Sequence, residues 1–214
     1  MPRKKHIKIA QVRTFSNVFD FSNINVESDL QKYFLKEQPL TIELGCGQAD
    51  YSINLAINFP ERNFIGIDRK PNRLWNASKN ATTLNVSNVA FLIAYAEKLE
   101  EVFKNLKAEE IWITFPDPYP RNGSIKKRLT HPRFLQIYKS ILTSNGKVNL
   151  KTDDDTLYEY TLKIISEENL KLVFATEDLY SASNLGYEKT IKTKYEKMHL
   201  ENEKKIKLIT FSFT

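Results

Sequence analysis

The 214-residue sequence has few of the residues that mark disulfide-rich or metal-binding proteins. It has one cysteine, Cys46, so an intrachain disulfide is excluded. Its three histidines, His6, His131 and His199, are too far apart along the chain to indicate a metal site by spacing. We therefore expect no metal and a location in the reducing cytoplasm.

Long apolar runs are also lacking. The longest, residues 90–96, falls far short of the ~20 residues that a membrane-spanning helix needs. Residues 1–13 contain no apolar segment of the kind found in signal peptides. We therefore expect a soluble protein that does not enter a membrane.

What the chain has instead is an excess of basic residues. Lys and Arg total 32 against 26 Asp and Glu, a net charge of +6, which favours polyanionic partners. Residues 1–13 include five of these cations and no acid, which predicts a basic arm. The length predicts one domain. We expect residues 1–39 to form the arm and a short helical lead-in with a helix near 30–36, residues 40–214 to form the domain, and the protein to be a monomer or homodimer.

From residue 40 onward, short apolar runs alternate with amphipathic segments, as in parallel strands joined by helices. Strands are predicted at 41–45, 63–68, 89–94, 110–115, 147–151, 171–176 and 205–214. Helices are predicted at 51–59, 71–84, 133–142 and 154–168. The fold class is therefore α/β, with a mostly parallel seven-stranded sheet and helices on both faces.

Ligands of such folds bind at the carboxyl ends of the strands. After the first of these strands, Gly45 and Gly47 form a tight turn whose backbone N–H groups can approach a ligand. Asp68 ends the next strand, where a carboxylate can accept both hydroxyls of a ribose. Either feature alone is more often a simple turn, but together they predict a site for a nucleoside-containing cofactor.

The turn also bears on which cofactor binds. A dinucleotide site has a third glycine where Asp50 stands, and Glu43 would face a phosphate unfavourably. S-adenosylmethionine carries a sulfonium, an amino group and a ribose but no phosphate. It is therefore the better candidate, with Glu43 and Asp68 as its acidic contacts.

The fourth predicted strand of this series runs into Phe115-Pro116-Asp117-Pro118-Tyr119-Pro120, where prolines stiffen the chain. Asp117 could accept from the N1–H and N2–H₂ groups of a guanine whose N7 faces the cofactor. On the motif alone, a turn cap is an equally good interpretation. The cations that follow without an intervening acid are Arg121, Lys126, Lys127, Arg128 and Arg133. They suit a phosphate backbone, although most such runs are solvated surfaces.

Two further segments carry weaker signals. Asp153 follows the fifth predicted strand and adds an acid at the same edge, unless Asp153 or Asp154 simply caps the next helix. Thr193, Lys194, Tyr195 and Glu196 lie in a lysine-rich region that, from composition alone, is predicted to be a solvated loop.

In their order and spacing, these segments resemble the bacterial tRNA (guanine-N7)-methyltransferase family over nearly the whole chain. The segments that carry the resemblance are Phe115–Pro120 with Lys127-Arg128-Leu129, Lys151-Thr152-Asp153, and Thr193–Glu196. It implies a Rossmann-like class I methyltransferase domain at 40–214, S-adenosylmethionine as methyl donor, and the variable-loop guanine of tRNA as substrate.

The resemblance also implies roles for particular residues. Those implied at the cofactor are Glu43, Gly45, Gly47, Asp68, Tyr95 and Asp117, with Asp117 at the reacting centre. Those implied at the RNA are Arg121, Lys126, Lys127, Arg128, Asp153, Thr193, Lys194, Tyr195 and Glu196, helped by the arm before Gln11. The chain departs from the family at Ala49, which replaces a glycine, at Tyr95, which replaces Asp or Asn, and at Asn122-Gly123-Ser124, which thins the charge.

Guanine N7 has a lone pair and no proton at neutral pH, so its methylation needs no general base. The lack of a candidate catalytic histidine agrees with this chemistry. Three alternatives stay open from the sequence: an N6-adenine-type nucleic-acid methyltransferase, an NAD-dependent oxidoreductase, and an RNA-binding module without catalysis.

Overall fold

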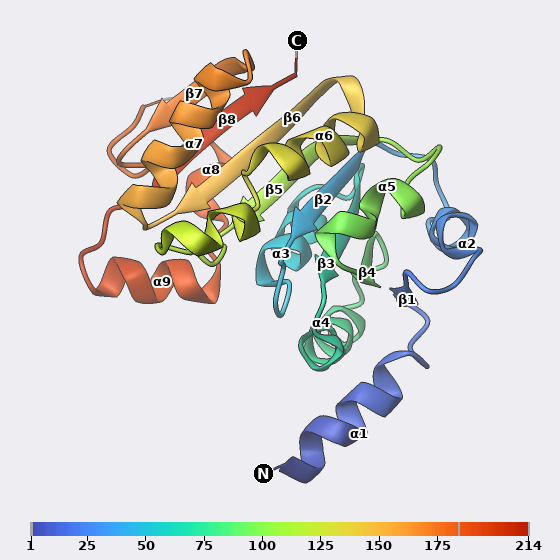
Figure 1. The fold of residues 1–214 in the computed structure, drawn as a ribbon. Coiled ribbons are helices and arrows are strands. Elements are labelled where there is room, and N and C mark those ends of the chain that lie inside the picture. Colours follow the sequence, from blue (N-terminus) through green and yellow to red (C-terminus); the bar gives the residue numbers. More distant parts are fainter. Residues whose placement is uncertain (1, 184, 214) are drawn as a thin grey trace.

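A computed structural model of the chain describes residues 2–183 and 185–213, with side chains from Lys5 onward. Thr214, at the end of the predicted last strand, and the side chains of Arg3 and Lys4 in the basic arm lie outside this set. One eight-stranded sheet crosses the molecule in the order β1-β4-β3-β2-β5-β6-β8-β7 (Figure 1).

The strands are β1 (Val18–Asp20), β2 (Leu40–Leu44), β3 (Asn63–Asp68), β4 (Val89–Ile93), β5 (Ala108–Thr114), β6 (Leu142–Thr152), β7 (Lys171–Thr176) and β8 (Lys207–Ser212). From β1 to β6 in sheet order, all neighbours pair in parallel, and β8 runs antiparallel between β6 and β7. The mostly parallel α/β fold is therefore confirmed, but the count of seven strands is wrong. The additional strand, β1, has three residues and pairs with β4 at the sheet edge, too short to show an alternating pattern.

The helices are α1 (Pro2–Val12), α2 (Val26–Tyr33), α3 (Asp50–Asn58), α4 (Pro71–Thr83), α5 (Leu99–Val102), α6 (Pro132–Ile141), α7 (Asp155–Glu167), α8 (Tyr187–Thr190) and α9 (Lys194–Glu201), with 3₁₀ turns η1 (Ala96–Lys98) and η2 (Asn122–Lys127). The four helices predicted after residue 40 are confirmed as α3, α4, α6 and α7. The predicted lead-in helix is α2, which begins at Val26. The loop predicted at 193–196 is wrong, because α9 begins there.

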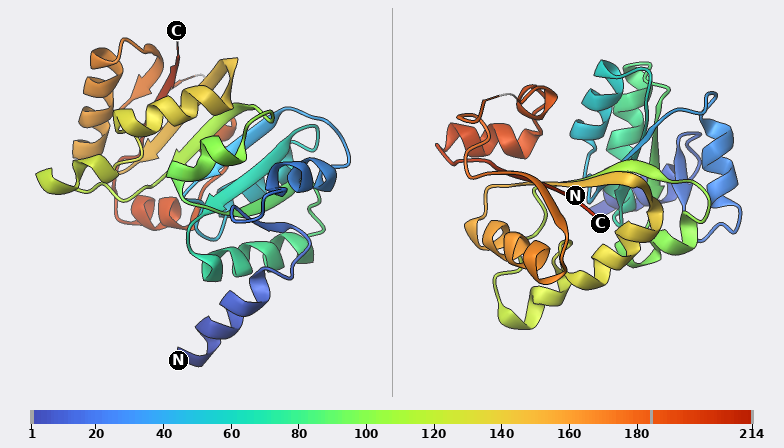
Figure 2. Two further views of the ribbon diagram at one scale, coloured as in Figure 1. Left: turned by 45° about the vertical axis from the view of Figure 1, so that its right-hand side comes forward. Right: turned by 90° about the horizontal axis from the view of Figure 1, so that it is seen from above.

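Helices cover both faces of the sheet. Figure 2 shows α3, α4 and α9 on one face and α6 and α7 on the other. The sheet residues Ile42, Ile65 and Ile111 are fully buried in the core that also contains α6 and α7. On the opposite face, Phe64 and Trp112 pack with α3 and α4 in a second core. Burial on both faces explains why these strands are almost wholly apolar.

The arrangement of β2 determines where a ligand can bind. Its neighbours are β3 on one side and β5 on the other. The chain therefore adds β3 and β4 on one side of β2 and then returns to add β5 and β6 on the other side. The loops after β2 and β5 therefore separate at the carboxyl edge and leave a crevice, as open α/β sheets do at a topological switch point.

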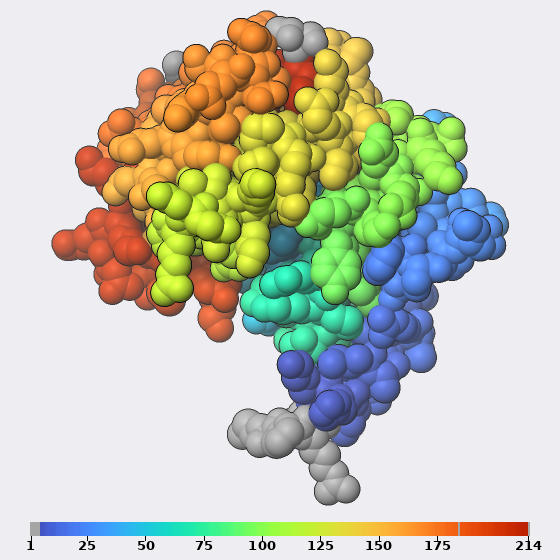
Figure 3. All heavy atoms as spheres, viewed as in Figure 1, coloured from blue at the N-terminus to red at the C-terminus, as the bar shows by residue number. Residues whose placement is uncertain are grey.

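The basic N-terminal arm is helical and rests on α4. Figures 1 and 3 show α1 projecting from the rest of the molecule beside α4. Lys8 Nζ donates to Asn76 Oδ1 at 2.6 Å and lies 4.4 Å from the centre of the Trp75 ring. The Trp75 indole N–H donates to Gln11 Oε1 at 3.2 Å. These contacts hold α1 on the same side of the sheet as α4.

A buried ion pair fixes α9 against the end of β6. Lys151 Nζ lies 2.8 Å from Glu196 Oε1, and both side chains have no exposed surface. The Tyr180 hydroxyl donates to the same oxygen at 2.8 Å. Thr193 and Glu196 also form a capping box that satisfies the first turn of α9. This pair joins two segments that are 45 residues apart in the chain.

Replacing one partner of this pair is expected to destabilise the protein strongly. Glu196→Ala leaves the Lys151 ammonium buried and unpaired, which costs about 3–5 kcal/mol of unfolding free energy. Urea titration followed by circular dichroism measures the loss. Glu201→Ala, at an exposed acid of the same helix, is the control and should change stability by less than about 0.5 kcal/mol. Lys151→Met combined with Glu196→Leu should recover much of the loss, since no unpaired charge remains; equal losses for Glu196→Ala and Glu201→Ala would refute the assignment.

Candidate active site

Two adjoining cavities lie at the switch point. The first has a volume of about 490 Å³ and lies between the ends of β3 and β4 and the loop after β5. The second has a volume of about 790 Å³ and lies between the turn after β2 and the start of α9. Figure 3 shows the hollow between the yellow-green segment after β5 and the teal segment of α4. Both volumes suit small-molecule ligands, which typically occupy about 300–1,000 Å³.

The glycine turn borders both cavities, and both of its glycines have a left-handed backbone. Gly45 has φ +69° and Gly47 has φ +61°, values that residues other than glycine rarely adopt. Ala49 also has a positive φ of 57° and is fully buried, so the residue that replaces a glycine keeps a glycine-like backbone. Asp50 begins α3 as its first residue rather than capping it, because Ala49 occupies the N-cap position.

Glu43 lies beneath this turn and is almost fully buried. The Ser52 N–H and hydroxyl donate to its Oε2, and the Thr114 hydroxyl donates to its Oε1 at 2.7 Å. Burial raises the pKa of Glu43 to about 7, although these hydrogen bonds oppose the rise. Glu43 therefore lines the second cavity as a desolvated, hydrogen-bonded carboxyl group.

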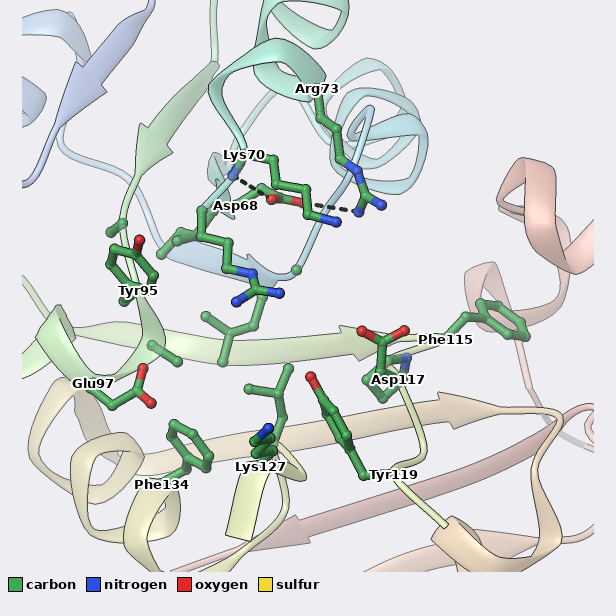
Figure 4. A pocket seen from close by; sticks show the side chains of 18 of the residues that line it. Asp68, Lys70, Arg73, Tyr95, Glu97, Phe115, Asp117, Tyr119, Lys127 and Phe134 are labelled. Atoms are coloured by element: carbon green, nitrogen blue, oxygen red, sulfur yellow. Dashed lines mark hydrogen bonds and ion pairs between the residues drawn. The ribbon is translucent and has the colours of Figure 1, made fainter. Parts of the chain in front are cut away.

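Asp68, at the end of β3, lines the first cavity and ties three segments together. It accepts from the Gly47 N–H at 3.0 Å and from the Lys70 N–H at 2.8 Å. Arg73 Nη1 lies 3.5 Å away (Figure 4). A carboxylate has about four acceptor sites, so these contacts leave capacity for a ligand hydroxyl.

Asp117 lies on a strained loop and faces both cavities. Phe115 and Tyr119, on either side of it, have positive φ values of 49° and 44°. Such a backbone costs of order 1–3 kcal/mol per residue and persists only where neighbours hold it. Here the Phe115 N–H donates to the Lys151 carbonyl at 2.9 Å. Figure 4 shows Asp117 across the cavity from Asp68 and Arg73.

Arg128 is the other group that holds this loop. Its Nε donates to the Pro118 carbonyl at 2.9 Å and its Nη2 to the Tyr119 carbonyl at 3.1 Å. The guanidinium also stacks on Tyr160, and only 3% of the residue is exposed. Arg128 is therefore buried against the loop, with two of its nitrogen atoms bonded inside the protein, and its predicted contact with phosphate stays a prediction. Arg121, Lys126 and Lys127 are exposed around η2.

Asp153 and α9 meet beside the Asp117 loop. Asp153 Oδ2 lies 2.7 Å from Lys204 Nζ and 3.4 Å from His199 Nδ1. The His199 ring stacks on Phe115 with centroids 5.7 Å apart. Of the four residues at 193–196, Lys194 and Tyr195 are exposed, whereas Thr193 and Glu196 are buried in the capping box and the ion pair. In this segment, the Lys194 and Tyr195 side chains are therefore accessible to a ligand, whereas the Glu196 carboxylate is held inside the protein.

The structure brings together only part of the predicted set. The predicted residues that line the first cavity are Gly45, Asp68, Tyr95, Asp117, Lys127 and Arg133. Those that line the second are Glu43, Gly45, Gly47, Asp117, Thr193, Lys194 and Tyr195. Those outside both are Arg121, Lys126, Arg128, Asp153 and Glu196. Tyr95 stands at the rim, half exposed, with its ring edge-on to Phe21.

Sequence reasoning missed Arg73, which lines both cavities. Its position two residues after Pro71, in the first turn of the helix that follows Asp68, is the signal that could have identified it.

Within residues 2–183 and 185–213, no helix has the length and apolar character needed to cross a membrane. Over the same residues, no three His, Cys, Asp or Glu side chains are grouped so that they could hold a metal ion.

A mostly parallel sheet with a glycine turn, an acid after the next strand and an acidic loop at the switch point is typical of the class I methyltransferase fold. Solved structures agree at the level of the fold. An antibiotic-related methyltransferase has a TM-score of 0.65 at 21% identity over 88% of this chain and 94% of its own. A 30S ribosomal A1408 methyltransferase from an uncultured bacterium has a TM-score of 0.64 at 20% identity over the same shares.

Sequence comparison identifies the family. The model of the family described as "Putative methyltransferase" matches residues 37–209. A tRNA (guanine-N(7)-)-methyltransferase of Cytophaga hutchinsonii is 38% identical over 100% of this chain and 99% of its own length. Relatives of the same name from Christiangramia forsetii and Listeria monocytogenes are 41% and 37% identical, over 85% and 78% of this chain and 81% and 76% of theirs. The chain belongs to the tRNA (guanine-N(7)-)-methyltransferase family.

The buried Glu43 predicts a pH-dependent contribution to stability. Its pKa is about 7 in the folded protein against an ordinary value of 4.5, so the folded state binds a proton that the unfolded chain has released. The contribution to unfolding free energy therefore falls as pH rises from about 4.5 to about 7, by about 3 kcal/mol in all. In urea titrations at several pH values, the unfolding free energy of Glu43→Gln minus that of wild type should rise by this amount across that range. A difference that is constant with pH would contradict the prediction.

Proposed function

We propose that this protein transfers the methyl group of S-adenosylmethionine to N7 of the variable-loop guanine of tRNA. The family membership supports the reaction, since the relatives that match this chain almost end to end are named for it. The observation that carries the proposal in the structure is that Asp117 lines both cavities. A cofactor in one cavity and a base in the other would meet at its carboxylate.

The first cavity fits an adenosine group. Asp68 has acceptor capacity for the ribose hydroxyls, and the Gly45–Gly47 backbone leaves room for close approach. Tyr95 and Phe134 offer apolar surface on the opposite wall (Figure 4). The cofactor supplies a sulfonium-activated methyl group, and the residues of this chain bind and orient it.

Asp117 is the proposed catalytic residue. Its carboxylate is exposed to both cavities and is held by a loop that Arg128 and Lys151 brace. Guanine N7 carries no proton, so the protein has only to align N7 with the methyl group and to stabilise the positive charge that develops on the purine. A fixed carboxylate beside the base would do both.

The proposed partner is tRNA, whose target guanine lies in the folded core and has to be extruded. Three exposed parts of the chain would contact the RNA. They are the cations Arg121, Lys126 and Lys127 around η2, the side chains of Lys194 and Tyr195 at the start of α9, and the helical arm α1. A tRNA substrate is in keeping with the cytoplasm, the location that we propose.

The experiment that tests the function uses purified protein, unmodified tRNA transcripts and methyl-labelled S-adenosylmethionine, followed by nucleoside analysis. N7-methylguanosine that disappears when the variable-loop guanine is replaced supports the proposal. Labelled N6-methyladenosine would favour the adenine alternative, and RNA binding without transfer would favour a binding module.

Replacing Asp117 is expected to separate catalysis from cofactor binding. Asp117→Ala should lower the rate of methyl transfer by at least about 100-fold to 1,000-fold, since a preorganised electrostatic contact is lost. Asp117→Asn tests whether the charge itself is needed. Calorimetric titration with S-adenosylhomocysteine should give nearly wild-type affinity for both variants. Weakened cofactor binding of the same size as the rate loss would reassign the residue.

The exposed cations around η2 predict a steep dependence of tRNA binding on salt. The binding constant K falls as salt rises, and each phosphate contact adds just under one to the magnitude of the slope of log K against log salt concentration. The double variant Lys126→Ala with Lys127→Ala should therefore reduce the magnitude of that slope by about two in filter-binding titrations. Lys163→Ala, on the exposed side of α7, is the control and should leave it unchanged. A flat response of the wild type to salt would count against the role of these cations.

A further inference from the structure

Two charged residues line both cavities, and they have opposite signs. Among the residues that the structure describes, the lining that the two cavities share consists of Gly45, Arg73, Phe115 and Asp117. Arg69, Lys70, Lys127 and Arg133 line the first cavity alone, and Lys194 and Lys197 line the second alone. Where the cavities meet, the cation is therefore Arg73 and the anion is Asp117.

The Arg73 guanidinium is only loosely held within the protein. Its Nη1 lies 3.5 Å from Asp68 Oδ2, beyond the usual range of 2.7–3.2 Å for an N–H···O bond. The same oxygen already accepts the Gly47 N–H at 3.0 Å. The Arg73 side chain is 40% exposed and has five N–H donors in a planar fork. Most of this donor capacity is free for a ligand.

The guanidinium also stands directly over the glycine turn. A Cβ atom added at Gly47 would lie 4.0 Å from Arg73 Nη1. A ligand that lies against the turn would therefore pass beneath the fork. Figure 4 shows Arg73 on the wall that also carries Asp68, facing Asp117 across the cavity.

We propose that Arg73 binds the α-carboxylate of the methionine part of S-adenosylmethionine and so sets how the cofactor lies between the two cavities. This inference rests on the proposed function. The cofactor's methionine end bears one carboxylate among cationic groups, and a planar fork binds a carboxylate through two parallel hydrogen bonds. Asp68 would receive the ribose, and Asp117 would face the sulfonium and the base. Arg73 would hold the carboxylate at the methionine end.

The test compares two ligands that differ in one group. Decarboxylated S-adenosylmethionine keeps the nucleoside, the sulfonium and the amino group and lacks the carboxylate. Calorimetric titration without RNA gives the affinity of each ligand for wild type, Arg73→Gln, Arg73→Lys and the control Arg62→Gln. Arg62 precedes β3, pairs with Glu109 and lines neither cavity.

Arg73→Gln should weaken binding of S-adenosylmethionine by about tenfold to a hundredfold, the usual range for a hydrogen bond to a charged group. Its affinity for the decarboxylated ligand should stay at the wild-type value. Arg73→Lys should keep part of the affinity, since it keeps the charge without the fork. Arg62→Gln should bind both ligands as the wild type does.

Each other outcome overturns the inference in a recognisable way. Equal losses for both ligands would mean that Arg73 acts through Asp68. Unchanged cofactor affinity with a lower salt slope for tRNA would assign Arg73 to an RNA phosphate. A wild-type protein that binds neither ligand would refute the proposed function itself, and with it the inference.

Discussion

The candidate site depends on Lys151, at the end of β6. Its buried ammonium binds Glu196 of α9, and its backbone carbonyl accepts the N–H of Phe115, where the Asp117 loop begins. One residue therefore positions two walls of the second cavity. Burial of two charges is costly, but here the Tyr180 hydroxyl and the Ile191 carbonyl add hydrogen bonds to the pair. Burial also lowers the pKa of Lys151, and the Glu196 carboxylate opposes this effect.

The sequence predicts the central fold well because strands covered on both faces leave a clear apolar pattern. β2 to β5 follow this rule, and Pro71 and Pro132 mark the starts of α4 and α6. β1 could not be predicted, since three residues show no periodicity and the strand exists through its pairing with β4. α9 was missed for a related reason. Its lysines suggest a solvated loop, and its helical form depends on Thr193 and Glu196 capping each other and on a partner 45 residues away.

Within the site, predictability follows from the topology of the sheet. Gly45, Asp68 and Asp117 each follow a parallel strand, so the rule that ligands bind at the carboxyl edge identifies them without coordinates. Arg128 shows where this reasoning fails. The sequence gives its charge and its neighbours, but only the fold shows that its donors meet the Pro118 and Tyr119 carbonyls. The position of Arg73 in the first turn after Asp68 can be read from the sequence, but only the structure shows that Arg73 lines both cavities.

Three of the carboxyl groups that line the cavities, Glu43, Asp68 and Asp117, have different surroundings. Glu43 is buried among hydroxyls and has its pKa raised to about 7, so a large share of it is protonated near neutral pH. Asp68 is held by two backbone N–H groups and faces Arg73. Asp117 is exposed on the loop after β5. The charged side chains that line both cavities are therefore Asp117 and Arg73, one acid and one cation. This pairing suits a zwitterionic ligand better than a polyphosphate, in agreement with the proposal of S-adenosylmethionine rather than a dinucleotide.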